Sequence, residues 1–179
     1  VGIADSGLTA LQEVTPSPIV ADILEGLSPS ERVGQLFLVT FQGSSVEEGT
    51  PIFDLVTRYG VGGLILSATN DNFDDRENIM LATREMTEKL QEAAFDASMV
   101  AYEETSLATP RMLSVYLPLL IGVSQEGNGA PYSEILTGVT PLPSSMAVGA
   151  TWSRDAARVV GEVTGYELSR LGINLILGP

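Results

Sequence analysis

The sequence predicts an α/β fold built around a parallel sheet. Short apolar segments rich in strand-forming residues alternate along the chain with amphipathic segments of helical period, which is the order of βαβ units. The apolar segments are hydrophobic nearly throughout instead of alternating with polar residues, as expected of strands that are covered on both faces. This pattern fits either an open doubly wound sheet or part of a (β/α)8 barrel.

Each predicted element has its own signal in the sequence. Strands are predicted over 35–41, 61–67, 117–124 and 173–179, and helices over 18–27, from 28 onward, over 50–60, 74–98 and 153–172. Ser28, followed by Pro29 and by Glu31 at the third position, has the pattern of a capping box. Ser153 precedes the last helix and Gly172 follows it, which are the preferred residues at those two ends.

The order of the strands and the buried helix face can also be predicted. Because βαβ connections are right-handed, the strands are expected to be parallel in the order 1-2-3-4. Gln42, Asn70 and Ser124 follow successive strands and should therefore lie at the same end of the sheet. Helix 74–98 is expected to bury the face that carries its apolar residues Ile79, Ala82, Met86 and Leu90.

The domain organisation suggests one half of a larger barrel. Residues 1–17 are predicted to be a leader or linker, and residues 18–179 the N-terminal half of a barrel with a long excursion at 99–116. The chain stops on an apolar strand with no helix to cover it, and four βα units are half of a barrel of about 250 residues. The first residue is Val1 rather than Met, so we expect a processed protein located outside the cell or at its surface.

The composition excludes several classes of function. The chain of 179 residues carries a formal net charge of −14, which disfavours nucleic acid as a partner, and it has no apolar run long enough for a membrane span. Cysteine and histidine are both absent, so disulfides, thiol catalysis and zinc sites built from these residues are excluded.

No cofactor is expected. The segment 70–75, NDNFDD, begins like a calcium loop, but it lacks the required glycine and glutamate, so we expect no metal and assign its acids to helix capping.

Several stretches together resemble one family. The segments LSPSERVGQLFLVTF, YGVGGLILS, LPLLIGVSQEG and TPLPSSMAVGATWSRDAARVVGEVTGYELSRLGINLILGP are similar to the N-terminal barrel domain of glycoside hydrolase family 3, which includes β-glucosidases and β-N-acetylglucosaminidases. The resemblance runs from about Leu27 to Pro179, apart from the excursion. It implies that β-linked sugars are removed from non-reducing ends by a retaining mechanism, which needs two carboxyl groups.

The resemblance also locates the catalytic groups. The family carries its nucleophilic Asp, and in one branch an Asp–His pair, on later loops of the barrel, and this chain has no histidine. We therefore expect no catalytic residue in this chain, no activity from it alone, and a partner in the remainder of the barrel, either the C-terminal part of the same protein or a second chain. An inactive glycosidase-like scaffold, or a binding or assembly subunit, remains the alternative.

Three residues are predicted to contact a β-linked carbohydrate: Ser124, Glu126 and Asn70. The family usually reads Asp-Gln-Glu-Gly-Gly-Arg where this chain has Ser-Gln-Glu-Gly-Asn-Gly over 124–129. Ser124 can bind a sugar hydroxyl only as a neutral group, whereas the family's Asp makes stronger, charge-assisted hydrogen bonds. Gly129 likewise replaces a cationic residue.

The other polar and aromatic groups near this segment have simpler interpretations. Glu126 could take part in chemistry, but we expect it to bond neighbouring backbone N–H groups and shape its loop. Ser124 cannot be a serine nucleophile of the usual kind, because no histidine is present to act as its base. Trp152 and Tyr132 could stack on a sugar ring, although partial burial by packing is the expectation.

Overall fold

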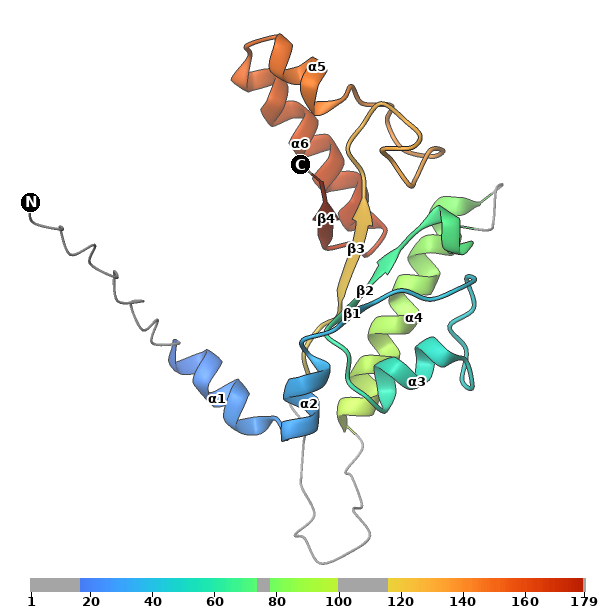
Figure 1. The fold of residues 1–179 in the computed structure, drawn as a ribbon, viewed down its shortest axis with the longest axis vertical. Coiled ribbons are helices and arrows are strands. Elements are labelled where there is room, and N and C mark those ends of the chain that lie inside the picture. The colour runs from blue at the N-terminus through green and yellow to red at the C-terminus, as the bar shows by residue number, and fades with distance from the viewer. Residues whose placement is uncertain (1–16, 74–77, 100–115, 179) are drawn as a thin grey trace, which may run out of the picture.

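The structure is a computed structural model that describes residues 17–73, 78–99 and 116–178. The predicted leader and the predicted excursion at 99–116 lie almost wholly outside the described residues. Four short strands form one parallel sheet: β1 (Leu38–Val39), β2 (Gly63–Leu66), β3 (Leu120–Ser124) and β4 (Leu175–Leu177). Their order is β1-β2-β3-β4, as predicted (Figure 1). This sequential order is that of a barrel, since a doubly wound sheet reverses its order at a switch point.

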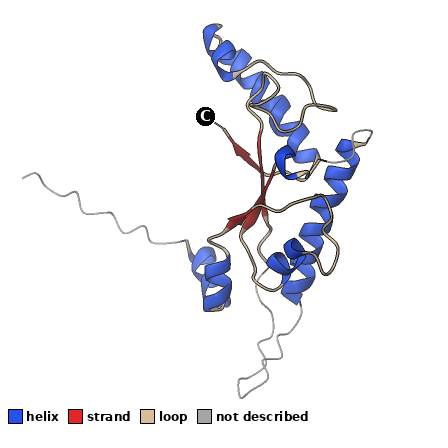
Figure 2. Ribbon diagram, turned by 45° about the vertical axis from the view of Figure 1, so that its right-hand side comes forward, coloured by secondary structure: helices blue, strands red, loops and turns tan. Residues whose placement is uncertain are grey.

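The helices pack mainly on one side of this sheet. They are α1 (Pro18–Gly26), α2 (Pro29–Gly34), α3 (Pro51–Thr57), α4 (Ile79–Met99), α5 (Ser145–Ala150) and α6 (Arg154–Arg170), with a 3-10 turn η1 (Ala68–Asn70). Helices α4 and α6 lie along the same side of the strands (Figure 2). The hydroxyl of Thr87 on α4 donates to Leu171 O at the end of α6, at 2.7 Å, and fixes the two helices to each other.

The capping signals in the sequence are confirmed. Ser28 N donates to Glu31 Oε2 at 2.6 Å while Glu31 N donates to Ser28 Oγ at 3.2 Å, which closes the capping box before α2. The Ser153 hydroxyl accepts from Ala156 N at the start of α6, and Gly172 follows the helix with φ of 73°. Helix α5 was not predicted, because its six residues are too few to show a hydrophobic period.

The predicted strand at 35–41 begins too early. Helix α2 continues to Gly34, and Gln35 caps it, so that only Leu38 and Val39 pair with β2. The reason is a contact distant in sequence: the Gln35 side chain donates to Gly60 O at 2.9 Å, and a Cβ on Gly34 would meet Tyr59 O at 2.2 Å. The backbone is thus held close to the end of α3 before the strand can form.

The two faces of the sheet have different surroundings. Leu64, Leu66, Ile121 and Val123 point to the helices and are completely buried. Their strand neighbours point to the opposite, inner face, since side chains alternate along a strand. On this inner face Leu38 is 43% exposed and Leu120 is 46% exposed. Over β2 and β3 the described residues thus bury one face of the sheet, and they leave apolar side chains of the inner face accessible.

Side-chain amides complete the sheet at its amino-terminal edge. Asn174 Oδ1 accepts from Ile121 N at 2.8 Å and its Nδ2 donates to Leu119 O at 2.9 Å. From α4, Gln91 binds both backbone groups of Leu119, at 3.0 Å each. These side-chain bonds continue the hydrogen-bond pattern of β3 at its amino-terminal end.

Gly63→Ala should destabilise the intact protein, because the new methyl group would meet Leu120 O at 2.1 Å and side-chain atoms of Leu38 and Leu120 at under 3 Å. We expect a loss of roughly 1–3 kcal/mol, the usual cost of overpacking. Gly149→Ala in α5 is the matched control, because nothing lies within 4 Å of its Cβ position. That change should be neutral or stabilising. Urea unfolding of both variants measures the difference, and equal stabilities would contradict the close approach at Gly63.

Candidate functional site

The loops that follow β1, β2 and β3 meet at one edge of the sheet, as predicted for Gln42, Asn70 and Ser124. Gly43 N donates to Asn70 O at 2.7 Å, which joins the first two loops. Glu134 N donates to Ser124 O at 3.0 Å, and Ala68 N donates to Glu134 Oε2 at 2.6 Å, which joins the second and third. We call this edge, residues 40–50, 67–73 and 124–135, the rim.

Asn72 is the most deeply buried polar residue of the rim. Its side chain is 2% exposed and bonds to both neighbouring segments. Oδ1 accepts from Ser67 N at 2.9 Å, while Nδ2 donates to Phe41 O at 3.1 Å and to Gly43 O at 2.7 Å. One amide thus satisfies three backbone groups that no strand ladder reaches, and it fixes the loop after β1 against the loop after β2.

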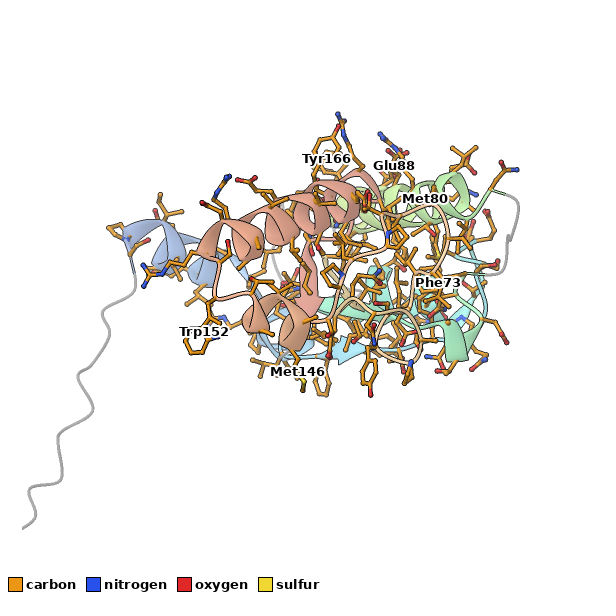
Figure 3. All side chains as sticks on the ribbon, turned by 90° about the horizontal axis from the view of Figure 1, so that it is seen from above. Phe73, Met80, Glu88, Met146, Trp152 and Tyr166 are labelled. Carbon is orange, nitrogen blue, oxygen red and sulfur yellow. The ribbon has the colours of Figure 1, made fainter. Side chains whose placement is uncertain are left out.

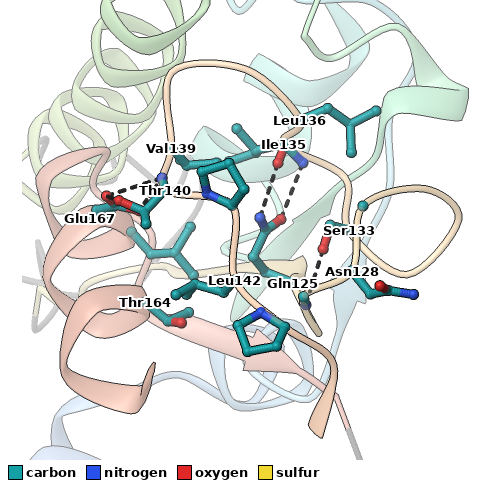
Figure 4. A pocket seen from close by; sticks show the side chains of 15 residues that line it. Gln125, Asn128, Ser133, Ile135, Leu136, Val139, Thr140, Leu142, Thr164 and Glu167 are labelled. Atoms are coloured by element: carbon teal, nitrogen blue, oxygen red, sulfur yellow. Dashed lines mark hydrogen bonds between the residues drawn. The ribbon is translucent and has the colours of Figure 1, made fainter. Parts of the chain in front are cut away.

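The loop after β3 is shaped by Gln125 and by a left-handed turn. Gln125 binds both backbone groups of Ile135, at 3.0 and 3.1 Å, as if it were a strand neighbour (Figure 4). Between them, Gly127, Asn128 and Gly129 all have positive φ, of 83°, 64° and 69°. A Cβ on Gly127 would also meet Pro143 O at 2.3 Å, so that position requires glycine.

The sequence-predicted site residues all lie on the rim. Ser124 is half-buried at the end of β3, on the same side of the strand as Leu120 and therefore on the inner face. Asn70 is half-buried at the end of η1, and its carbonyl accepts from Gly43 N. Glu126 is half-buried, and its backbone N–H donates to Tyr132 O at 2.9 Å. Whether these side chains contact a sugar stays a prediction.

The expected role of the Glu126 side chain is wrong. Within the described residues its carboxylate has no hydrogen-bond partner, so it does not brace the loop through backbone N–H groups. That role belongs to Gln125 and to Glu134, which the sequence did not single out. Glu134 is one polar residue among several in a loop, and its partners at 67 and 68 are too distant in the sequence to leave a local pattern.

Two hollows adjoin the rim. One of about 390 Å³ lies between the loop after β3 and α6, and a wider one of about 600 Å³ is lined by Glu126, Trp152 and Ile176 among others. The expectation that packing partly buries the aromatic groups is wrong for Trp152, which is 95% exposed and stands out from the body of the molecule (Figure 3). Tyr132 is exposed as well.

An exposed ion pair joins the loop after β1 to α4. Lys89 on α4 binds Glu47 in the loop after β1, with Nζ 2.5 Å from Oε1. The hydrogen bond to Glu47 raises the pKa of Lys89. Because both side chains are exposed, water and salt screen this pair and its contribution to stability is small. Among the described residues there is no cluster of three acidic groups that could hold a metal ion, and no helix with the length and hydropathy to cross a membrane.

A family model describes most of this chain. The model of the glycosyl hydrolase family 3 N-terminal domain matches residues 29–179. The chain belongs to glycoside hydrolase family 3. This family domain begins at α2 and includes every strand of the sheet and the whole rim.

Solved structures and curated relatives agree with this family. The structure of a family 3 β-N-acetylglucosaminidase from Paenibacillus sp. is 27% identical over 86% of this chain and 24% of that chain, with a TM-score of 0.67. A fungal multi-domain family 3 β-N-acetylglucosaminidase is 29% identical over 85% of this chain and 15% of its own, with a TM-score of 0.64. Probable beta-glucosidase M of Emericella nidulans is 39% identical over 59 residues, 33% of this chain and 7% of that protein. The chain thus spans a quarter or less of the length of each of these three proteins.

Asn72→Ala should lower the free energy of unfolding by roughly 2–3 kcal/mol, because it leaves three partly buried backbone groups without this partner. The matched control is Gln42→Ala, which removes an exposed amide of the same rim whose one bond, to Asp71, is 3.4 Å long. The control should change stability by less than about 0.5 kcal/mol. Urea unfolding of the intact protein measures both variants. A loss at Asn72 no larger than that at Gln42 would show that the buried amide does not hold the rim together.

Proposed function

We propose that the protein containing this domain is a glycoside hydrolase that removes β-linked sugars from non-reducing ends with retention of configuration. The observation that carries the proposal is the rim of a family 3 domain at the carboxyl ends of parallel strands, where barrel enzymes place their active sites. The relatives are named as β-glucosidases and β-N-acetylglucosaminidases, which favours a terminal β-linked glucose or N-acetylglucosamine as the substrate.

In this proposal the rim binds the sugar but does not cleave it. Ser124, Asn70 and Glu126 offer a hydroxyl, an amide and a carboxylate, the usual partners of sugar hydroxyl groups. Retaining hydrolysis needs a nucleophile and an acid/base about 5–5.5 Å apart on either side of the scissile bond. The rim comes from three adjacent loops and therefore supplies one wall of a pocket. We place the catalytic carboxyl groups beyond residue 179.

The proposed partner of this domain is the remainder of the barrel, either the C-terminal part of the same polypeptide or a second chain. Two apolar surfaces support it. The inner face leaves Leu38 and Leu120 accessible, and a barrel interior is normally filled by side chains from all its strands. On α6, no described atom outside the adjoining part of the helix lies within 4 Å of the Cβ positions of Gly161 and Gly165, which leaves room for a closely packed neighbouring helix.

A second candidate function is a binding scaffold that has kept the fold without the chemistry. The observation in its favour is the pair of changes in the loop after β3, where Ser124 and Gly129 replace the charged Asp and Arg of the family pattern. A scaffold of this kind has no need for charge-assisted contacts to a sugar.

Ser124→Asp in the intact protein should raise the affinity for a β-linked sugar, because a charged acceptor binds hydroxyl groups more strongly than a neutral one. The gain should be about 1–2 kcal/mol. Ser124→Asn is the matched control, since it has the same shape without the charge, and it should bind no more tightly than the natural protein. Calorimetry with glucose and N-acetylglucosamine measures all three. If neither the natural protein nor Ser124→Asp binds either sugar, the scaffold function is supported instead.

Residues 1–179 expressed alone should show no glycosidase activity, because they lack the proposed catalytic carboxyl groups and the opposite wall of the pocket. The accessible apolar inner face should also make this polypeptide aggregate. Assays with aryl β-glucoside and aryl β-N-acetylglucosaminide, together with light scattering, check both expectations. A soluble monomer that turns over either substrate would contradict them and would locate the chemistry on this rim.

A further inference from the structure

Glu134 joins two loops of the rim that are distant in the sequence. Its backbone N–H donates to Ser124 O at 3.0 Å, which attaches it to the end of β3. Its half-buried carboxylate accepts from Ala68 N at 2.6 Å and from the Ser67 hydroxyl at 3.3 Å, which attaches it to the loop after β2. Each carboxylate oxygen therefore has a donor from the protein itself.

These bonds determine where η1 lies. Ala68 is the first residue of η1 and Asn70 the last, so a bond to the Ala68 amide holds the start of the turn that presents Asn70. Asn72 and the bond from Gly43 N to Asn70 O then attach the loop after β1. A continuous set of hydrogen bonds therefore runs across the ends of three strands, and Glu134 is its link to Ser124.

We propose that Glu134 is a positioning residue that fixes Asn70 relative to Ser124 and so sets the spacing at which the rim meets the hydroxyl groups of a sugar. The inference rests on the proposed function. A sugar ring presents its hydroxyl groups at fixed separations, and hydrogen bonds weaken steeply when donor and acceptor are displaced. We assign Glu134 a role through the loops it joins, because each of its oxygens accepts from a donor in the loop after β2.

The test compares three substitutions of Glu134 in the intact protein. Glu134→Ala removes both carboxylate contacts and should raise the KM for aryl β-glucoside or aryl β-N-acetylglucosaminide about tenfold. The kcat should stay close to that of the natural protein, because the proposed catalytic groups lie on other loops. Glu134→Gln keeps the length and one acceptor oxygen for Ala68 N, and it should restore KM. Glu134→Asp keeps the charge but is shorter by one methylene group, so it should not restore KM.

The chain offers a matched control in Glu167. Its carboxylate accepts from Thr140 N at 3.0 Å and from the Thr140 hydroxyl at 2.6 Å, the same two kinds of donor that Glu134 has. It joins a loop to α6 instead of joining two loops of the rim (Figure 4). Glu167→Ala should therefore lower the melting temperature about as much as Glu134→Ala does and leave KM unchanged.

Hydrogen exchange adds a measurement that does not depend on a sugar. The Ala68 amide should exchange faster in Glu134→Ala than in the natural protein or in Glu167→Ala.

The outcomes distinguish the positioning role from the proposed function. Faster exchange together with a raised KM that Glu134→Gln restores supports the proposal. If turnover is normal and the KM of Glu134→Ala rises no more than the KM of Glu167→Ala, the positioning role is overturned while the proposed function stands. If the natural protein neither binds nor cleaves the two substrates, the proposed function fails and the role of Glu134 in sugar binding fails with it. If Glu134→Ala does not fold, the comparison of Asp with Gln decides by the same criteria.

Discussion

The structure depends on side-chain amides that act as additional backbone. The strands have two to five residues each, so their ladders leave many backbone groups unpaired at both edges of the sheet. Four side-chain amides each bind backbone groups through both their oxygen and their nitrogen: Asn72, Gln91, Gln125 and Asn174. An amide is suited to this because it carries both functions on one rigid plane, whereas a carboxylate only accepts.

These amides act differently at the two edges of the sheet: at one edge they join separate elements, and at the rim they hold loops in shape. At the amino-terminal edge, Gln91 and Asn174 both donate to Leu119 O, so α4 and β4 are fixed to the same point of β3. At the rim, Asn72 and Gln125 satisfy the backbone from within the loops. Within the described residues, no backbone group is hydrogen-bonded to the hydroxyl of Ser124. Loops that are held internally can present polar side chains without losing their shape.

The sequence predicted what local signals determine. The strand order follows from the βα alternation, and the helix starts at Ser28 and Ser153 follow from capping residues within three positions of their partners. The buried face of α4 was predicted only in part. Thr87 is buried because it reaches Leu171, 84 residues away. The rim shows the same limit: the position of Ser124 could be predicted, but Glu134 acts on a loop 66 residues earlier and gives no local pattern.

The two departures from the family pattern in the loop after β3 belong together physically. Replacing an Asp by Ser124 removes a negative charge, and replacing an Arg by Gly129 removes a positive one, so the charge of the loop is unchanged. Gly129 also has φ of 69°, a conformation that is strained for any residue with a Cβ, so an arginine would not suit the loop in its present shape. The loop therefore carries neither of these two charges, and its turn is shaped by glycine. At its far end the same loop returns to the sheet, where Glu134 N donates to the carbonyl of Ser124 at 3.0 Å.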